Sequence, residues 1–168
     1  YWEVREKISK ACPALLSRNL QAICEGTLEL KPQDHGRATF TRKLSKEDGA
    51  LDFSLSAVEI GNRIRALTPH IGCCIDYHGT PLKIGAVSVD RADCSAFECG
   101  EIISVSGDAL KIATGNGSLM IHRLQRPGGR MLEILDFANG FGIRSGEIIP
   151  SYAPQPLLST SPFLRKRK

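Results

Sequence analysis

The sequence predicts a mainly β fold with flanking helices, in which a small OB-like β-barrel follows a helix, a linker and N-terminal helices. About five short apolar runs, separated by turn residues such as Gly, Asn and Asp, occupy residues 72–149. A capped helix pattern precedes these runs, and a second helical pattern lies near their end. Closing short strands into a barrel removes their unpaired edges, so a barrel is favoured over an open sheet.

The N-terminal region is predicted to be helical over residues 3–25, either as one helix or as two helices that meet at Pro13. A short apolar stripe contains Val4, Ile8 and Ala11. A second stripe contains Leu15, Leu16, Leu20, Ile23 and Cys24. Gly26 accepts the left-handed conformation that often closes a helix. The chain starts without an initiator Met or an apolar signal region, so we expect a piece of a longer, non-secreted protein.

Residues 27–44 are predicted to be a linker, because Pro32, Asp34 and Gly36 interrupt any periodic pattern. The last part of this segment, from Thr39 to Leu44, is basic and is expected to be extended. A linker of this kind separates the N-terminal helices from everything that follows.

A polar turn over residues 45–49 leads into a strongly signalled helix. Ser56 and Glu59 form an S-x-x-E capping box, in which each side chain satisfies a backbone N–H of the first turn. The apolar face of the helix comprises Ala57, Ile60, Ile64 and Leu67. Pro69 disfavours helical geometry at the residue before it, so the helix is predicted to end near Thr68.

Short strands are predicted after Gly72, wherever an apolar run ends at turn residues. They cover residues 73–77, 82–89, 101–105, 109–114 and 118–124. Gly115-Asn116-Gly117 is a tight-turn signal, because Asn and Gly tolerate positive φ angles. A short helix over 131–139 and a last strand over 147–149 complete the predicted barrel.

Alternation along the strands predicts which side chains face the core. The expected set is Leu82, Ile84, Ala86 and Ser88 on the second strand, Leu119, Ile121 and Arg123 on the fifth, and Leu132, Leu135 and Phe137 or Ala138 on the helix. Ser88 and Arg123 are included only because the alternation extends to them.

The net charge of +4 comes from the C-terminal end. Residues 151–168 contain no Asp or Glu, are rich in Pro and Ser, and finish with four basic residues, so we expect a disordered basic tail. The other 18 basic residues balance the 18 acidic ones. Any binding of nucleic acid must therefore come from local clusters of basic side chains. No apolar run approaches the roughly 20 residues of a bilayer span, so no membrane partner is expected.

Six cysteines invite a disulfide interpretation, but a chain of this size does not need covalent staples, and reduced thiols are expected. Cys94 and Cys99 with Cys73, Cys74, His70 or His78 could be assembled into a zinc site. Their spacing fits no paired-knuckle pattern, so no metal is expected.

No catalytic constellation is found in the sequence. It contains no G-x-S-x-G elbow, no H-E-x-x-H motif and no phosphate-binding glycine loop. The four histidines, His35, His70, His78 and His122, are scattered, and a structural role is expected for each. Asp48 and Asp52 are expected to cap a turn and a helix entry.

Basic residues of the segment around the capped helix and of the second strand are the candidates for RNA binding: Arg42, Lys43, Lys46, Arg63, Arg65 and Lys83. A basic face on an OB-type barrel can follow backbone phosphates. The alternative is ordinary solvated charge, because Glu47, Asp48 and Glu59 lie among them.

The segment from Arg37 to Pro69 carries a family resemblance. Its matching elements are Ala38-Thr39-Phe40, Lys43–Glu47, Asp52–Ser54 and Ile64–Ala66. In this order they resemble the linker and first C-terminal helix of methionyl-tRNA formyltransferases. Weaker similarity is found at residues 25–27, 32–34, 79–83, 113–115 and 137–140, so the resemblance extends to about Pro150.

The resemblance implies a division into residues 1–26, a helical remnant of the N-terminal catalytic domain, residues 27–44, a linker, residues 45–150, the C-terminal barrel domain, and the tail 151–168. It implies a parent enzyme of translation initiation that transfers a formyl group from 10-formyltetrahydrofolate to methionyl-initiator tRNA. The expected partners are that tRNA and the enzyme's own N-terminal Rossmann-like domain.

The family's catalytic Asn, His and Asp and its folate segment have no counterpart here, so this chain is expected to hold no catalytic residue and no cofactor. A monomer in a bacterial cytoplasm or an organellar matrix is expected. The apolar stripe from Leu15 to Ile23 would then lack its usual sheet and be exposed, disordered or covered by a partner.

Two alternatives remain open at this point. Related C-terminal domains occur in other formyl-folate-dependent enzymes, where the barrel is structural and binds no tRNA. A free-standing interaction domain held by zinc is the third possibility. Neutralising Arg42, Lys43 and Lys46 would distinguish a tRNA-binding domain from a structural one. Metal analysis would decide whether the domain is held by zinc.

Overall fold

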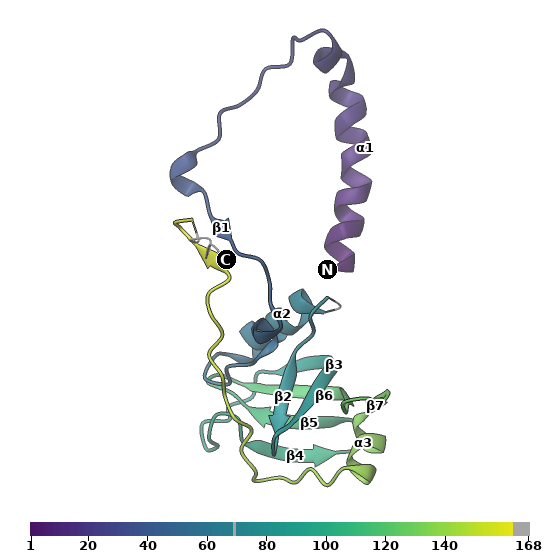
Figure 1. Cartoon of the computed structure of the whole chain (residues 1–168), viewed down its shortest axis with the longest axis vertical. Coiled ribbons are helices and arrows are strands. Elements are labelled where there is room, and N and C mark those ends of the chain that lie inside the picture. The colour runs from purple at the N-terminus through teal and green to yellow at the C-terminus, as the bar shows by residue number, and fades with distance from the viewer. Residues whose placement is uncertain (69, 163–168) are drawn as a thin grey trace, which may run out of the picture. The chain divides into compact units, whose positions relative to one another are not determined.

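The computed structural model describes residues 1–68 and 70–162 (Figure 1). Its contacts divide the chain into two compact units. The terminal unit contains residues 1–42 and the C-terminal segment from Pro156, and the barrel unit contains Lys43–Gln155. The four-segment division expected from the resemblance stays a prediction.

The terminal unit begins with helix α1, Trp2–Cys24. Of the two alternatives, a single helix is found, and it runs through Pro13 without a break. Gly26 adopts φ +67°, and the N–H of Thr27 donates to the carbonyl of Ala22, which is the expected left-handed closure. No residue of α1 is buried.

The rest of the terminal unit holds a 3₁₀ turn, η1 (His35–Arg37), and a two-stranded sheet. Strand β1 (Phe40–Thr41) pairs antiparallel with β8 (Leu158–Ser159). The strand β8 lies in the segment for which the sequence analysis expected disorder. The four basic residues at the end of that tail lie outside the described residues.

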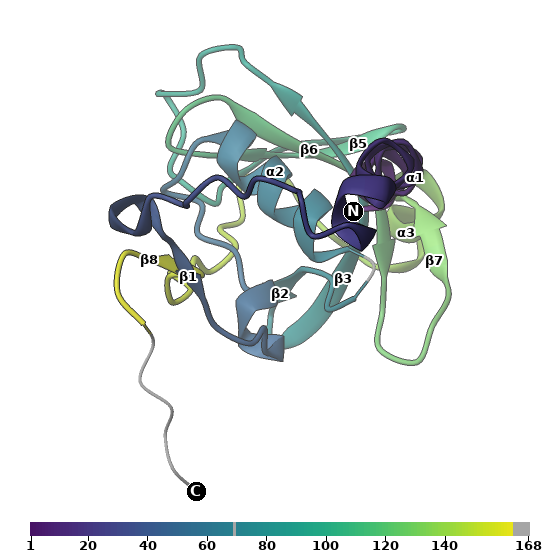
Figure 2. The same cartoon turned by 90° about the horizontal axis from the view of Figure 1, so that it is seen from above.

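The barrel unit is built around a curled antiparallel sheet, which Figures 1 and 2 show wrapping beside helix α2. Its strands are β2 (Cys74–Tyr77), β3 (Thr80–Asp90), β4 (Ile102–Ser106), β5 (Ala109–Ala113), β6 (Ser118–Gln125) and β7 (Met131–Glu133). The order is β2-β3-β6-β5-β4, and β7 also pairs with β6. The predicted fold class, mainly β with flanking helices and a small barrel-like sheet, is confirmed.

Two bulges in the long β3–β6 pair change the predicted pattern of core-facing residues. Ile84 pairs with Leu124, but Ala86 pairs with Arg123 and Val87 with Ile121, so one strand and then the other carries an extra residue. Beyond the bulges the alternation is inverted. Ser88 and Arg123 are therefore exposed, and their assignment to the core is wrong.

Helix α2, Ala57–Leu67, is formed as predicted. The Ser56 hydroxyl accepts from Glu59 N–H, the Glu59 carboxylate accepts from Ser56 N–H, and the predicted apolar face is buried. The residue before Pro69, Thr68, is the C-terminal cap. This face packs against β3 and β6.

The region after β6 differs from the prediction at both of its elements. Residues 131–133 form β7, so helix α3 is shorter and covers Ile134–Gly140. The shifted start places Ile134 and Phe137 inward and leaves Leu135 54% exposed, so its core assignment is wrong. Residues 147–149 make only an isolated bridge, Glu101 to Ile148, rather than a strand.

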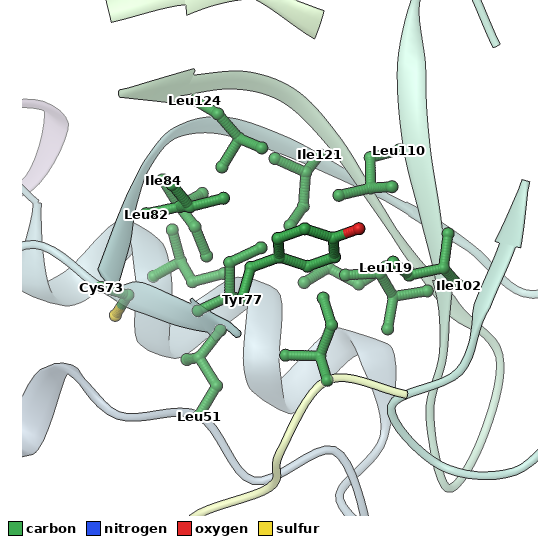
Figure 3. Close-up of a cluster of buried hydrophobic side chains, with 14 of the residues drawn as sticks. Leu51, Cys73, Tyr77, Leu82, Ile84, Ile102, Leu110, Leu119, Ile121 and Leu124 are labelled. Atoms are coloured by element: carbon green, nitrogen blue, oxygen red, sulfur yellow. The ribbon is translucent and has the colours of Figure 1, made fainter. Parts of the chain in front are cut away.

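The core of the barrel unit fills the inside of the curled sheet. Figure 3 shows Leu82, Ile84, Leu119 and Ile121 gathered around the ring of Tyr77, and all four aliphatic side chains are fully buried or nearly so. Helices α2 and α3 add side chains to the same cluster. Among the described residues, no helix has the length and apolar character that a membrane crossing needs.

Candidate nucleic-acid interface

A groove of about 510 Å³ runs beside β2, the edge strand of the sheet. We call it the β2 groove. Apolar side chains of Ile71, Ile75 and Pro81 line it, and its polar side chains are Lys46, Glu47, Cys74, Asp76 and Tyr152. Its volume lies in the range of small-ligand sites.

The edge of β2 itself contributes to the groove. The N–H of Ile84 donates to the carbonyl of Cys73, so these two residues form a hydrogen-bonded pair of the β2–β3 ladder. Antiparallel pairs alternate, which leaves the backbone groups of Cys74 and Asp76 directed away from β3. Both residues line the groove, so its wall offers backbone donors and acceptors that no other described residue pairs.

A 3₁₀ turn, η2 (Lys46–Gly49), also lines the groove and is held at both ends. The buried Asp48 carboxylate accepts from Ser45 N–H at 2.7 Å, which confirms the expected capping role of Asp48. A Cβ on Gly49 would lie 2.5 Å from the carbonyl oxygen of Gly72, so only glycine allows this approach. Lys46 is thereby fixed beside the groove.

Lys83, on β3, lies beside the groove at Gly72, which is one of its lining residues. It pairs with Cys74 across the β2–β3 ladder, and its aliphatic chain lies over Gly72, where an added Cβ would meet Lys83 Cε at 2.8 Å. Burial raises the pKa of the Cys74 thiol, and the Lys83 charge opposes that rise. Of the predicted RNA-binding residues, Lys46 therefore lines the groove, and Lys83 contacts one of its lining residues, Gly72.

The other predicted residues are placed differently. Arg63 is half-buried and donates from Nε and Nη2 to the carbonyl of Asp48, at 3.2 and 2.8 Å, which ties α2 to η2. Arg65 is exposed and donates to Asn62 on its own helix. Arg42 belongs to the terminal unit and donates from Nε to the carbonyl of Pro156. Lys43 is exposed at the start of the barrel unit.

Asp76 and Tyr152 close one side of the groove. Tyr152 is 50% exposed and is anchored by its N–H, which donates to the carbonyl of Leu51. Its hydroxyl donates to Asp76 Oδ2 over a long 3.4 Å. Asp76 Oδ1 is buried and has no hydrogen-bond partner among the described residues. A buried acceptor without a partner is unusual in a folded protein.

Glu47 is the acidic residue beside Lys46 in this wall. A hydrogen bond from the Ser45 side chain lowers the pKa of Glu47, so it is ionised at neutral pH. The charged residues of the groove lining are therefore Lys46, Glu47 and Asp76, with Lys83 beside Gly72, so its charge is mixed rather than uniformly positive.

A second polar cluster lies at the β2–β3 turn. The Tyr77 hydroxyl donates to Glu147, and His78 Nε2 lies 3.5 Å from the same carboxylate. Burial and the Glu147 hydrogen bond raise the pKa of Tyr77, and the same bond lowers the pKa of Glu147. This cluster joins the β2–β3 turn to the segment after α3.

The remaining candidate chemistry is dispersed. His122 contacts Ser88 Oγ at 2.7 Å and the carbonyl of Asp108 at 2.8 Å. All six cysteines are free, and burial raises the pKa of Cys73 to about 11. Within residues 1–68 and 70–162, no group of three His, Cys, Asp or Glu side chains is placed to hold a metal ion.

Sequence reasoning missed Cys74, Asp76 and Tyr152 as groove residues. A single charged residue inside the apolar run 73–77 was a signal that could have identified Asp76. Nothing local marks Tyr152, because its place depends on pairing with Leu51, about a hundred residues earlier in the chain.

Comparisons with known proteins agree on one family of formyl transferases. Residues 43–142, more than half of the chain, match the family described as "Formyl transferase, C-terminal domain". A methionyl-tRNA formyltransferase of Roseiflexus sp. (strain RS-1) is 37% identical over 133 residues, covering 79% of this chain and 41% of that protein. One from Neisseria meningitidis serogroup A is 35% identical over 145 residues, covering 86% and 46%. The chain thus spans less than half the length of these relatives.

Solved structures share the fold at low sequence identity. A variant of HypX from Aquifex aeolicus matches with a TM-score of 0.55 and 14% identity, covering 80% of this chain and 25% of that one. A second HypX variant matches with a TM-score of 0.53 and 13% identity, covering 87% and 28%. At such identities the likeness concerns the fold alone.

Proposed function

Because the chain belongs to the family of formyl transferase C-terminal domains, we propose that it is the tRNA-binding C-terminal part of a methionyl-tRNA formyltransferase. The observation that carries the proposal is the similarity to methionyl-tRNA formyltransferases over most of this chain, at 35–37% identity. The parent enzyme would formylate methionyl-initiator tRNA for translation initiation, in a bacterial cytoplasm or an organellar matrix.

The formyl donor of that parent reaction would be 10-formyltetrahydrofolate, and the residues described here do not fit its site. The His122 ring contacts the Ser88 side chain, and the His78 ring lies beside the Glu147 carboxylate. Neither histidine is joined to the Asn and Asp side chains that the family uses. We therefore place formyl transfer in another part of the parent enzyme, with no step carried out by this chain.

A Rossmann-like domain of the same polypeptide is the proposed partner of α1. The stripe of Leu15, Leu16, Leu20 and Ile23 is between 49% and 62% exposed. Apolar grooves lie along the same helix, and one of them is lined by Cys12, Leu15, Leu16, Asn19, Ile23 and Leu28. A contiguous exposed apolar face of this kind is typical of a surface that is covered in the complete protein.

For tRNA binding, the supporting geometry is the pair of ammonium groups at the β2 groove. The backbone of Lys46 is held in η2, which lines the groove, and the Lys83 side chain lies against Gly72, another lining residue. Arg63 is the least suited of the candidates, because its guanidinium is engaged with the carbonyl of Asp48.

The experiment is a titration of the full chain with initiator tRNA at several salt concentrations. With about three phosphate contacts, log K should fall with log salt at a slope of about −2 to −3. The double variant Lys46→Ala/Lys83→Ala should weaken binding and reduce that slope by about one per lost contact. Lys111→Ala is the matched control, because Lys111 already pairs with Asp90 at 2.7 Å.

The second candidate function is a structural C-terminal domain of another formyl-folate-dependent enzyme. The mixed charge of the groove, with Glu47 beside Lys46, is the observation that favours it. Under this alternative the titration shows no shift of the tRNA even at low salt. Unchanged binding by the Lys46/Lys83 variant, with loss in Arg42→Ala/Lys43→Ala, would move the interface to the linker.

A further inference from the structure

The β2 groove combines three features that bear on what it can bind. Its lining is largely apolar, Lys46 in the lining and Lys83 beside the lining residue Gly72 supply ammonium groups, and Asp76 supplies a carboxylate with one oxygen that has no partner among the described residues. A ligand that matches all three has a flat apolar body, a negative group and hydrogen-bond donors on one edge. A nucleotide with N–H groups on its base has this chemistry.

We propose that the β2 groove binds one unpaired guanosine of an RNA strand, with the base edge on Asp76 and the adjoining phosphate on Lys46 and Lys83. The inference rests on the proposed RNA-binding function and names the nucleotide that this groove selects.

Guanine is selected by the donor pattern that Asp76 requires. An ionised carboxylate has acceptors only, and its two oxygens match two neighbouring donors. Guanine offers an imino N–H and an amino group side by side on its Watson–Crick edge. Adenine and cytosine offer one amino group beside a ring nitrogen acceptor, and uracil has one imino N–H between two carbonyl acceptors, so each of these repels one carboxylate oxygen.

The contact that Asp76 makes in the unbound chain is weak enough for a guanine edge to replace it. The bond from the Tyr152 hydroxyl to Oδ2 is long, at 3.4 Å, and Oδ1 has no partner. Aspartate χ2 is a soft torsion, so in the proposed complex the carboxylate rotates away from the tyrosine hydroxyl and presents Oδ1, which is buried in the unbound chain. The half-exposed Tyr152 ring then supplies an aromatic face on which a base stacks.

Charge complementarity favours RNA over an extended peptide on the free edge of β2. The edge is short, with only Cys74 and Asp76 directing backbone groups outward, so a peptide would gain few ladder hydrogen bonds. The two lysines instead favour a group with a full negative charge. Glu47 lies in the same groove, and its negative charge opposes phosphate binding, so removing that charge gives a second test of the site.

The test uses the full chain and four RNA pentamers, UUGUU, UUAUU, UUCUU and UUUUU, in fluorescence anisotropy titrations. UUGUU should bind about ten-fold more tightly than the other three, since a good bidentate contact discriminates by roughly this factor. Asp76→Asn should remove the preference, because its amide presents a donor towards the guanine donors. Asp108→Asn, in the turn between β4 and β5, is the matched control and should keep it.

Further variants separate the parts of the site. Lys46→Ala/Lys83→Ala should weaken all four pentamers alike, because phosphate contacts carry no sequence information. Tyr152→Ala should weaken them about five-fold or more through lost stacking. Tyr152→Phe keeps the ring and removes its hydroxyl from Asp76, so it should bind UUGUU at least as well as the unmodified chain. Glu47→Gln should tighten binding about two-fold by removing a like charge.

Equal affinity for the four pentamers, or an unchanged preference in Asp76→Asn, would overturn the inference. Guanosine monophosphate that binds as tightly as UUGUU would overturn its assignment to RNA. A Val-Thr-Val-Thr peptide amide that binds the groove when no pentamer does would assign the edge to a peptide instead. Initiator tRNA bound without any guanosine preference would overturn this inference alone, whereas guanosine binding without tRNA binding would overturn the proposed function.

Discussion

The two units of the chain bury their apolar residues very differently. Helix α1 is 23 residues long and carries a clear apolar stripe, yet none of its residues is buried. Helix α2 has 11 residues, and its apolar face is buried against the curled sheet. The difference shows that amphipathic pattern alone does not create a core, because burial requires a second surface within reach of the first.

The largest effect is expected from a substitution in the core of the barrel unit, and a substitution in the terminal unit is its control. Ile121→Ala should cost about 2–5 kcal/mol of unfolding free energy, because Ile121 is fully buried on the central strand β6. Leu20→Ala should change it by less than about 0.5 kcal/mol, because Leu20 is 50% exposed. Urea unfolding, monitored by the hydrogen exchange of β6 amides, measures the change in unfolding free energy of both variants. Similar losses for the two variants would show that α1 is packed in solution.

A smaller effect is expected at the close backbone contacts of the barrel unit. Gly115→Ala should cost about 1–3 kcal/mol, because a Cβ there would lie 2.0 Å from the carbonyl oxygen of Ser54. Gly107→Ala has no atom within 4 Å of the added carbon and is the matched control. Thermal unfolding of both variants tests the contrast. Equal melting temperatures would mean that the two backbone segments are not in contact.

The capping box of α2 should contribute about 1 kcal/mol. Ser56→Ala removes the acceptor of Glu59 N–H and a 2.6 Å hydrogen bond to the Glu59 carboxylate. The Ser56→Asn variant, which retains a capping group, should recover most of the loss. The urea concentrations at the midpoint of unfolding give the free-energy differences, provided that the dependence of the unfolding free energy on urea is the same in all variants. An undiminished midpoint in Ser56→Ala would show that packing against the sheet alone holds the first turn.

The smallest effect is a pH dependence at the Tyr77–Glu147 hydrogen bond. The pKa of Glu147 is lowered in the folded chain, so its ionised form stabilises the fold at pH values above the ordinary pKa of 4.5. This contribution is lost as the pH falls through the lower folded-state pKa. Tyr77, whose pKa is raised, loses its contribution only as the pH rises above its ordinary value of 10.0. Melting temperatures of the unmodified chain and Glu147→Gln should therefore differ at pH 7 and converge below pH 4.5. A gap that persists in acid would contradict the assignment.

The features that the sequence predicted correctly depend on neighbouring residues. The α2 capping box, its apolar face and the turn at Gly115–Gly117 are each encoded within a few positions, and all are present. The wrong assignments of Ser88, Arg123 and Leu135 depend on strand pairing, because the bulges and β7 exist only where β6 meets its partners.

The candidate site was predicted in part for the same reason. Lys46 and Lys83 could be named from charge alone, but their meeting at one groove depends on Gly49 and Gly72 coming into contact. The engagement of Arg63 with the Asp48 carbonyl was equally hidden, since fifteen positions separate the two residues. A basic residue that holds the backbone and one that faces solvent look identical in sequence.

The two bulges of the β3–β6 pair also constrain how the chain length can vary. Gly85 is the extra residue on β3 and His122 is the extra residue on β6, so the pairing offset introduced by the first is cancelled by the second. Because each is the unpaired residue of its bulge, deleting either one alone would remove that bulge and leave the flanking pairs Ile84–Leu124 and Val87–Ile121 in register. Deleting both would leave a regular ladder, so Gly85 and His122 are the positions of this strand pair at which a residue can be lost without sliding the strands, whereas loss of a paired residue would shift the register.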